Sequence, residues 1–455
     1  MRADERSGAG ALARRRLALA LLSRGRRADA LLCAGTDPVV ASRLGLHRLA
    51  ERGFRSRPPR GGEAYCAAVA SALACGDLDV ALDRAAAAPV GVREEVALTL
   101  ASVAVEEAGR FAPEGARLRA AIALRRGRVE EAEGLLADLQ GAEADLLRID
   151  AATRRSDLTA AAAGWRRVFE AGGLAAPEPI APERPLGPTN ARATAAPVAG
   201  GPLVSVIMPV CDVDDYVGAA VRSILDQTWR NLELIVVDDS SRDQTPLRVR
   251  AAAEGDGRVR LLATDRRSGP YRARNLALME ARGELVCFAD GDDWSHPERI
   301  ARQAAFMAGA GLAAASARHV RVDEAGRPYA RQLTPLVRWC PSSLMFRREP
   351  VLARAGHFDE ARTGADSEYW ARLGLAFGAR RVRTARDLLV VAAQRSTSLT
   401  GSAETGYAGG WSSARLRYWE AWNFWHARCR AAGRSPVWRS GDRRPFPVSA
   451  ELSTT

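Results

Sequence analysis

From residue 203 onward, short apolar runs alternate with helical segments, and this alternation constrains the fold more than any other feature of the chain. The runs are LVSVIM, LELIVV, VRLLA and ELVCFA, and the segments between them, such as YVGAAVRSILDQ and YRARNLALMEA, have helical periodicity. Uninterrupted apolar runs are typical of strands that are covered on both faces. The order predicts an open, mostly parallel α/β sheet whose ligands bind beyond the carboxyl ends of the strands.

The residues before this domain have a different character. Residues 1–174 are rich in Ala, Leu and Arg and predict an all-α region. A turn residue followed five positions later by Ala recurs at Gly25, Gly76, Gly127 and Ser156. This pattern resembles the second helix of tetratricopeptide-type hairpins, although its spacing is irregular. An irregular helical-hairpin array and a plain helical bundle are both compatible with the pattern.

Pro, Ala and Gly dominate residues 175–201, which predicts an extended, poorly ordered linker. The predicted α/β domain then spans residues 202–401, and a Trp- and Arg-rich helical extension occupies residues 402–455. In this extension Tyr418, Trp422, Trp425 and Cys429 share one helical face. The stripe is either the core-facing side of a helix packed on the α/β domain or an interfacial helix resting on an anionic membrane.

The chain contains no lysine, so all 66 of its basic residues are arginine. This excludes chemistry that needs a lysine amine, such as Schiff bases and the phosphate-loop lysine. Residues 1–60 hold 14 Arg against 5 acidic residues, and residues 402–455 hold 8 against 4, so the net charge of +12 belongs to two ends that flank a nearly neutral body. That distribution argues against a nucleic-acid groove. It favours an anionic membrane surface or an anionic lipid-linked substrate as a partner of the ends.

Seven cysteines are scattered without a C-x-x-C pair or a metal-ligand spacing, which is typical of reduced thiols. No apolar run approaches the ~20 residues that span a bilayer. We therefore expect a cytoplasmic protein, with peripheral contact at the inner face of the membrane as an open alternative.

Polar residues follow three of the predicted strands, at the edge where ligands of such sheets bind. The first strand ends in Pro209 and Val210 and runs into Cys211 and Asp212, the second ends in Asp238 and Asp239, and the fourth runs into Asp290, Asp292 and Asp293. Helix capping needs a single Asp, whereas paired carboxylates repel one another unless a cation or hydrogen-bond donors offset their charge. Asp290 and Asp292 flank a Gly turn and offer the hard oxygen ligands that hold Mg²⁺ or Mn²⁺ together with substrate phosphates. Arg274 offers a fixed cation to a diphosphate.

These motifs resemble, in order, those of the family 2 glycosyltransferases, whose nucleotide-diphospho-sugar fold is called GT-A. The matching stretches are VSVIMPV at 204–210, LELIVVDDSSRDQT at 232–245, SGPYRARNLAL at 268–278, LVCFADGDDW at 285–294 and GHFDEARTGADSEYWARL at 356–373. The resemblance covers under half of the chain. It implies a Rossmann-like GT-A domain preceded by the all-α helical-hairpin domain.

The resemblance also implies a role for individual residues. Those that would contact the nucleotide-sugar are Pro209, Val210, Asp238, Asp239, Arg274 and Asp290. Asp292 would bind the metal, with Asp293 beside it. Asp366 would be the general base, although Ala365 stands where relatives often carry Glu, and Glu368 is either a fallback base or a carboxylate on the helix surface. Arg395 lies either in a loop that closes over the diphosphate or in a simple surface loop, since the family's Q-x-x-R-W segment is absent.

The function implied is an inverting, Mn²⁺- or Mg²⁺-dependent transfer of a sugar from a nucleotide-diphospho-sugar to a hydroxyl of a saccharide or lipid-linked acceptor. The setting would be bacterial surface polysaccharide or glycoconjugate synthesis, with the helical region available to a protein partner. The alternative is a non-catalytic, nucleotide-binding scaffold. A nucleotidyltransferase is disfavoured because its Gly-rich opening loop and lysine are absent, and the lack of membrane spans argues against a processive polymer synthase.

Overall fold

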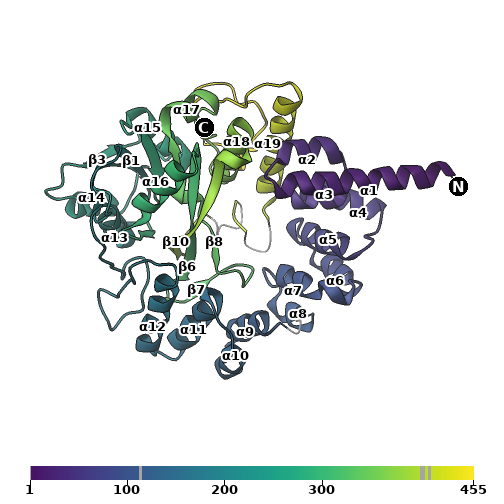
Figure 1. The fold of residues 1–455 in the computed structure, drawn as a ribbon, viewed down its shortest axis with the longest axis horizontal. Helices are drawn as coiled ribbons and strands as arrows, with labels where there is room; N and C mark the ends of the chain where they lie inside the picture. The colour runs from purple at the N-terminus through teal and green to yellow at the C-terminus, as the bar shows by residue number, and fades with distance from the viewer. Residues whose placement is uncertain (1, 112–114, 400–404, 408–410, 455) are drawn as a thin grey trace.

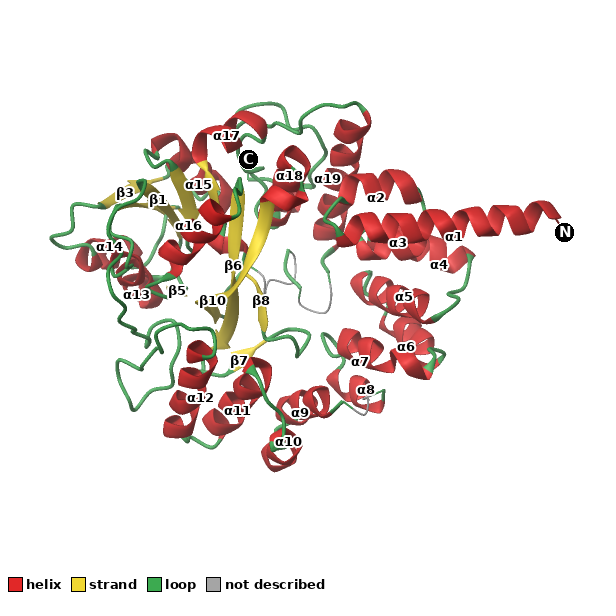
Figure 2. Ribbon diagram, in the orientation of Figure 1, coloured by secondary structure: helices red, strands yellow, loops and turns green. Residues whose placement is uncertain are grey.

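The computed structural model describes residues 2–111, 115–399, 405–407 and 411–454. Its N-terminal part is all-helical and its C-terminal part is built on one curved sheet (Figure 2). The helices of the N-terminal part are α1 (Arg2–Ser23), α2 (Arg27–Ala34), α3 (Pro38–Arg43), α4 (His47–Ser56), α5 (Gly62–Ala74), α6 (Leu78–Ala86), α7 (Arg93–Leu100), α8 (Val105–Arg110), α9 (Ala116–Arg125), α10 (Val129–Leu136), α11 (Ala142–Arg154) and α12 (Leu158–Glu170), with a 3₁₀ turn at Val90–Val92.

The recurring turn-and-Ala pattern occupies the same place in four of the helix pairs. Each turn residue has a positive φ, from 60° at Ser156 to 83° at Gly76, and so reverses the chain between two helices. The Ala five positions later is buried, with 0% exposure at Ala81 and 4% at Ala161. Small side chains at these positions let the two helices of a pair pack closely. The pairs follow one another around an arc (Figure 1).

Residues 175–201 contain no described helix or strand, as their composition predicts, but specific contacts hold them against the protein. Glu178 and Arg192 form an antiparallel bridge. The side-chain amide of Asn190 is 2% exposed and donates hydrogen bonds to the carbonyl oxygens of Ala181, Arg184 and Pro185. The segment is therefore a folded connection, and the expectation of a poorly ordered linker fails because one buried Asn pairs with several backbone groups.

The C-terminal part contains a ten-stranded sheet in the order β3-β2-β1-β4-β9-β6-β10-β5, with β7 and β8 paired to β6. The strands are β1 (Val204–Val210), β2 (Leu232–Asp238), β3 (Val259–Ala263), β4 (Leu285–Phe288), β5 (Trp294–Ser295), β6 (Ala314–Asp323), β7 (Pro328–Tyr329), β8 (Val337–Trp339), β9 (Met345–Arg347) and β10 (Val382–Gln394). Strands β1 to β4 are parallel, as the sequence predicts, and β6 and β10 are also parallel. Strands β5, β7, β8 and β9 pair antiparallel to their neighbours over two or three residues each, so the sheet is mixed, with its long ladders parallel. Short connections between β6, β7 and β8 leave no room for the crossover that parallel pairing needs.

Helices cover both faces of this sheet. Helices α13 (Asp214–Leu225), α14 (Thr245–Ala252) and α16 (Arg299–Gly309) share one hydrophobic core with β1 and β2. On the other face, α15 (Pro270–Glu280), α17 (Arg348–Arg354) and α18 (Ala365–Phe377) share a second core with α19 (Ser413–Ala431). Short 3₁₀ turns lie at Pro341–Ser343, Ala379–Arg381 and Ala450–Leu452.

The Trp-rich stripe of α19 belongs to this second core. Tyr418 and Trp422 are 1% exposed, and Trp425 and Cys429 are 6% and 7% exposed. The interpretation of this stripe as a membrane-resting face is therefore wrong, because protein already covers it. Among the described residues, no helix is long and apolar enough to cross a membrane.

The helical arc contacts the sheet domain at both of its ends (Figure 1). At one end, the ring of Phe169 in α12 stacks on that of His296, with centroids 5.5 Å apart. At the other end, α2 packs on α19, and Arg430 Nε lies 2.7 Å from Asp29 Oδ1. The arc and the sheet domain thus enclose a space between them.

Candidate active site

A cavity of about 1580 Å³ lies between the carboxyl ends of β1 and β4, the start of α18 and the inner side of the helical arc. Most of the residues singled out from the sequence line it, namely Pro209, Val210, Asp239, Arg274, Asp290, Asp292, Asp293, Asp366 and Arg395. Asp238 and Glu368 do not line it. The structure thus brings the proposed donor side and the proposed base into one cavity.

The two carboxylates at the end of β2 have different surroundings. Asp239 accepts hydrogen bonds of 2.7 Å from the backbone N–H groups of Ser268 and Gly269, and one of 2.8 Å from the Thr264 hydroxyl. It therefore holds the loop before α15 in place. Asp238 is 8% exposed, and its Oδ1 has no hydrogen-bond partner among the described residues.

The turn after β4 places Asp290 and Asp292 beside two arginines. Arg274 Nη2 lies 2.6 Å from Asp290 Oδ1, and Arg395 Nε lies 2.8 Å from Asp292 Oδ2. Only Gly fits between the two carboxylates, because a Cβ at Gly291 would lie 2.5 Å from Val210 Cγ1. The contact with Asp292 places Arg395 and the start of the segment after Gln394 against this turn.

The buried side chain of Asp293 connects the turn after β4 to β10 and to the 3₁₀ turn at Pro341–Ser343. Its Oδ1 accepts a hydrogen bond of 3.0 Å from Ala393 N, and its Oδ2 accepts one of 3.4 Å from the Ser342 hydroxyl. Burial raises its pKa well above the usual range, and the nearby carboxylates Asp292 and Asp290 add to the rise. Burial raises the pKa of Asp292 as well, with Arg395 opposing the shift and Asp290 adding to it. The turn concentrates negative charge in a poorly solvated place.

Such a turn fits a divalent cation that a substrate helps to hold. Among the described residues, no group of three or more His, Cys, Asp or Glu side chains is arranged to bind a metal ion. Mg²⁺ and Mn²⁺ are commonly bound by one or two carboxylates plus substrate phosphates, and Asp292 with Asp290 supplies that number. The donor set therefore fits a cation shared with a diphosphate, rather than one held by the protein alone.

Arg274 lies between the turn after β4 and Asp366, the candidate base. Burial lowers the pKa of its guanidinium, but the carboxylates of Asp290 and Asp366, together with Tyr271, raise it more, so the net shift is upward. Tyr271 lies beneath it, with the guanidinium carbon 5.1 Å from the ring centroid. Sequence reasoning missed Tyr271, although it stands three residues before Arg274 on one helix face. The neighbouring Asn275 is structural, since its side chain exchanges hydrogen bonds with the backbone of Phe358.

Asp366 lies in the first turn of α18, half-buried and facing the cavity. Its Oδ1 accepts a hydrogen bond of 2.7 Å from Ser367 N. The chain enters the helix through Gly364, whose φ of 86° is readily adopted only by Gly. This entry fixes where the carboxylate points.

The C-terminal extension braces the segment that carries Asp366. Arg415 Nη2 donates to the Thr363 hydroxyl over 2.6 Å, and the Tyr418 hydroxyl donates to Asp359 Oδ2 over 2.8 Å. Further along, the backbone N–H of Arg362 donates to the carbonyl of Leu452 over 2.8 Å. The extension is therefore part of the scaffold of the site.

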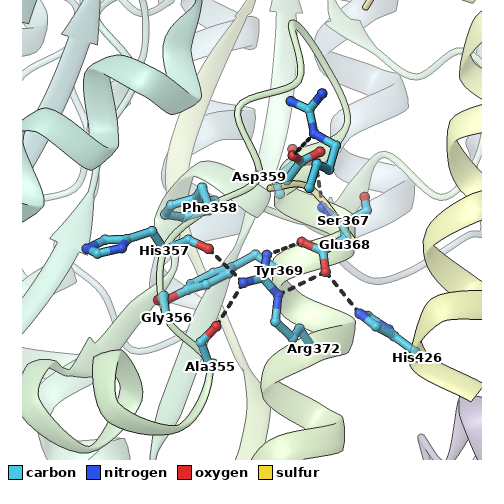
Figure 3. Close-up of polar contacts among 12 residues, drawn as sticks. Ala355, Gly356, His357, Phe358, Asp359, Ser367, Glu368, Tyr369, Arg372 and His426 are labelled. Atoms are coloured by element: carbon cyan, nitrogen blue, oxygen red, sulfur yellow. Dashed lines mark hydrogen bonds and ion pairs between the residues drawn. The ribbon is translucent and has the colours of Figure 1, made fainter. Parts of the chain in front are cut away.

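Glu368 belongs to a buried ion cluster (Figure 3). Its side chain and that of Arg372 are both 0% exposed, and they form a direct ion pair. Its Oε1 also lies 2.9 Å from His426 Nε2 of α19. Burial raises the pKa of Glu368, but Arg372 and His426 lower it more, so the net shift is downward. Glu368 is thus neither on the helix surface nor in the cavity, which leaves Asp366 as the candidate base.

The inner side of the helical arc forms the far wall of the cavity. The cavity is lined on this side by Leu73 and Ala74 of α5, by Thr99 of α7 and the following Val103, and by His47. These side chains are small or apolar, and burial lowers the pKa of His47 to about 4, so this wall is uncharged near neutral pH. No local pattern in residues 1–174 indicates that the helical region reaches the site.

The comparisons with known proteins match part of the chain. The glycosyl transferase family 2 model matches residues 205–364. A glucosyltransferase of Escherichia coli, described as UDP-Glc:alpha-D-GlcNAc-diphosphoundecaprenol beta-1,3-glucosyltransferase, is 37% identical over 105 residues, which is 23% of this chain and 41% of the relative. The succinoglycan biosynthesis protein ExoO of Rhizobium meliloti is 37% identical over 158 residues, which is 32% of this chain and 44% of the relative. The chain therefore spans less than half the length of these curated relatives.

Solved structures of glycosyltransferases show a partial likeness. The TarS protein of S. aureus, in complex with UDP-GlcNAc, has a TM-score of 0.38 and 23% identity, covering 45% of this chain and 64% of that chain. A mannosyltransferase of Pyrobaculum calidifontis has a TM-score of 0.36 and 20% identity, covering 64% of this chain and 76% of that chain. The part of the chain that carries the first four ordered motifs, residues 205–364, thus matches the glycosyl transferase family 2, and the match ends before Asp366.

Proposed function

We propose that this chain transfers a sugar from a nucleotide-diphospho-sugar to a hydroxyl group of a saccharide or lipid-linked acceptor, with inversion at the anomeric carbon. The setting proposed is the synthesis of a bacterial surface polysaccharide or glycoconjugate, on the cytoplasmic side of the membrane. The names of the E. coli and R. meliloti relatives support a role in polysaccharide synthesis.

One observation carries this proposal. The carboxylates of Asp290 and Asp366 both attract the buried guanidinium of Arg274 and so raise its pKa. The turn on the diphosphate side and the candidate base therefore share one cavity. Single displacement needs the leaving diphosphate and the base on opposite sides of the anomeric carbon, within one enclosed site. Structural capping alone would not require charged groups from β4, α15 and α18 to meet in a cavity.

The chemistry follows from the positions of these groups. Asp366 would take the proton from the acceptor hydroxyl as its oxygen forms a bond to the anomeric carbon. The bond from that carbon to the diphosphate breaks on the opposite face, and the electron pair leaves with the nucleotide diphosphate. Asp239 shapes the loop before α15 on the nucleotide side, and the unpaired Oδ1 of Asp238 is a candidate acceptor for a nucleotide donor group.

Two further groups complete the donor side. Asp292, with Asp290 beside it, would hold Mn²⁺ or Mg²⁺ together with the diphosphate, and this cation would offset the charge that develops on the leaving group. Arg395 is within reach of the same phosphates, because it already contacts Asp292. We therefore expect Arg395 to move from the carboxylate to a phosphate oxygen when the donor binds.

A donor screen tests the proposal. The full chain would be mixed with UDP-, GDP- and TDP-sugars, with Mn²⁺ or with EDTA, and its melting temperature and sugar release or transfer would be measured. Binding of the right donor raises the melting temperature by mass action. Asp292→Asn should lose the Mn²⁺-dependent part of this rise, whereas Asp79→Asn, at an exposed carboxylate on α6, should keep it.

The results separate the proposal from its rivals. Metal-dependent transfer, with an anomeric configuration opposite to that of the donor by NMR, supports it. A retained configuration contradicts the single displacement. Donor binding without transfer to any acceptor of a broad panel favours the non-catalytic scaffold.

A further inference from the structure

Three arginines line the cavity on the sheet side and lie close to one another. Arg321 is on β6, Arg338 is on β8, and Arg331 is in the connection that follows β7. The register pairs Arg338 with His319 and Arg321 with Tyr329, and alternate residues of a strand share a face. Arg321, Arg338 and His319 therefore point to the same side of the sheet, into the cavity.

Among the residues that the structure describes, none of the acidic side chains forms an ion pair with these three arginines. No carboxylate of a described residue lies within 4.0 Å of their guanidinium nitrogens. Arg321 and Arg338 each donate one hydrogen bond of 3.2 Å to an amide oxygen, that of Gln394 and Gln332 respectively. Arg331 donates none to a described residue, and its guanidinium carbon lies 4.9 Å from the ring centroid of Tyr407.

Three other buried arginines of the C-terminal part have more partners than these. Arg372 is paired with Glu368, and Arg274 with Asp290. Arg415 has no acidic partner, but it donates to three neutral oxygen atoms, in Thr405, Tyr407 and Thr363. The cluster of Arg321, Arg331 and Arg338 is half-buried, and it donates only two hydrogen bonds to the side chains of described residues.

The charges in the cluster repel one another. Burial lowers the pKa of Arg338, and Arg331 and Arg321 lower it further. Burial likewise lowers the pKa of His319 to about 3, again helped by Arg321 and Arg338. The carboxylates of Asp292, Asp293 and Glu143 interact electrostatically with arginines of the cluster but form no ion pair with them. Like charges kept together in a poorly solvated place are unfavourable unless a counter-charge joins them.

The cluster stands beside the reacting groups. Arg321 influences Asp292 on the diphosphate side. On the other side, Tyr407 lies between Arg331 and Arg415, and Arg415 is bonded to Thr363, three residues before Asp366. The opposite wall, formed by the helical arc, is uncharged. A ligand in the cavity thus meets the three arginines on the side of the sheet and an uncharged wall on the side of the helical arc.

We propose that Arg321, Arg331 and Arg338 bind a phosphate or diphosphate group carried by the acceptor, and so hold its hydroxyl near Asp366. Guanidinium groups present paired donors that match the oxygen atoms of phosphates, and three positive charges suit a diphosphate better than a single carboxylate. This inference rests on the proposed function and names its acceptor class. A lipid-linked sugar diphosphate and a phosphate-bearing glycan offer the same group.

Binding of inorganic pyrophosphate tests the arginines without any turnover. Calorimetric titration would be done in EDTA, so that no metal-bridged diphosphate forms at Asp292. The double variant Arg331→Gln, Arg338→Gln should raise the Kd at least about tenfold. Arg318→Gln is the matched control, because Arg318 is exposed and points to the opposite face of β6. Equal binding by the double variant and the wild type would overturn the proposal.

The melting temperature separates a binding role from a structural one. A binding cluster is held together against its own repulsion, so the double variant should melt no lower than the wild type. A clear fall in the melting temperature would mean that the arginines serve the fold, which contradicts the proposal.

Kinetics with different acceptors then show whether this inference fails by itself or whether the proposed transferase function fails. The acceptors would be an uncharged alkyl glycoside, the same sugar on an alkyl diphosphate, and a phosphate-bearing glycan fragment. We expect transfer to one of the two phosphate-bearing acceptors, and the acceptor that is used shows whether the phosphate belongs to a lipid or to a glycan. The KM for this acceptor should rise at least about tenfold in the double variant. The KM for the donor should stay unchanged. Equal transfer to the uncharged glycoside overturns the acceptor inference but leaves transferase activity standing. Pyrophosphate binding without donor turnover supports the arginine site and contradicts the transferase.

Discussion

The indole Nε1 of Trp419 donates a hydrogen bond of 2.7 Å to the carbonyl oxygen of Leu44, which lies 375 residues earlier in the chain. This contact joins the C-terminal helix α19 to the turn between α3 and α4. It closes the helical arc against the sheet domain, so that the arc can serve as the far wall of the cavity (Figure 1).

Gly45 should be the most sensitive residue of this closure. Its φ is 79°, and a Cβ there would lie 2.5 Å from Trp419 Nε1. Gly45→Ala therefore combines a strained backbone with a clash, and should lower the free energy of unfolding by more than the ~1–2 kcal/mol of a left-handed residue alone. Gly76→Ala is the control, with a φ of 83° and open space around it. Equal losses in denaturant titrations of the two variants would mean that the arc does not close on Trp419.

The Trp stripe should behave as core. Trp422 is 1% exposed, so Trp422→Ala should lower the free energy of unfolding by about 3–5 kcal/mol. Phe424 is on the same helix and 40% exposed, and Phe424→Ala should change it by no more than about 0.5 kcal/mol. If the two substitutions have the same small effect, and Trp422→Ala instead abolishes liposome binding, the stripe faces a membrane after all.

The ion cluster of Glu368 should matter for stability. Glu368→Gln leaves the buried guanidinium of Arg372 without a counter-charge, and should lower the free energy of unfolding by about 3–5 kcal/mol. Glu284→Gln removes an exposed partner of Arg347 and should have an effect of at most about 1 kcal/mol. If Glu368→Gln keeps the stability of the wild type but loses transfer, Glu368 acts in the chemistry rather than in the fold.

The buried histidines should each reduce the stability of the protein as the pH falls from 8 to 5. Burial lowers the pKa of each of the five histidines, and that of His47 falls to about 4. Between the folded pKa and the ordinary value near 6.5, the unfolded chain binds more protons, so acid favours unfolding. For His47 alone the difference between pH 8 and pH 5 is about 2 kcal/mol. His47→Gln should flatten the pH dependence of unfolding by that amount, and an unchanged slope would contradict the burial of His47.

Much of the donor side could be predicted from the sequence. Asp290 and Asp292 follow an apolar run directly, and the carboxyl ends of parallel strands share one edge of a sheet, so their place was determined by local pattern. The same logic placed Asp239 at the site, although its hydrogen bonds to Ser268 and Gly269 join residues about thirty positions apart and leave no local signal.

The acceptor side was harder to predict, because it depends on contacts between distant segments. Arg372 stands four residues after Glu368, which is a signal for an ion pair on one helix. That this pair is buried depends on His426 of α19, which no local pattern indicates. Tertiary packing likewise sets the register of β8 on β6, which brings Arg338 beside Arg321. It also sets the contact between Trp419 and Leu44.

The transfer rate of Asp366→Asn shows whether Asp366 is the general base of the reaction. Once a donor and an acceptor are known, kcat and the Kd of the donor would be measured for the wild type, for Asp366→Asn and for Asp79→Asn. Without its base, the Asp366 variant should lose about 10²–10⁴-fold in kcat and bind the donor as the wild type does, while Asp79→Asn should match the wild type in both. Transfer by Asp366→Asn at the rate of the wild type would contradict the account.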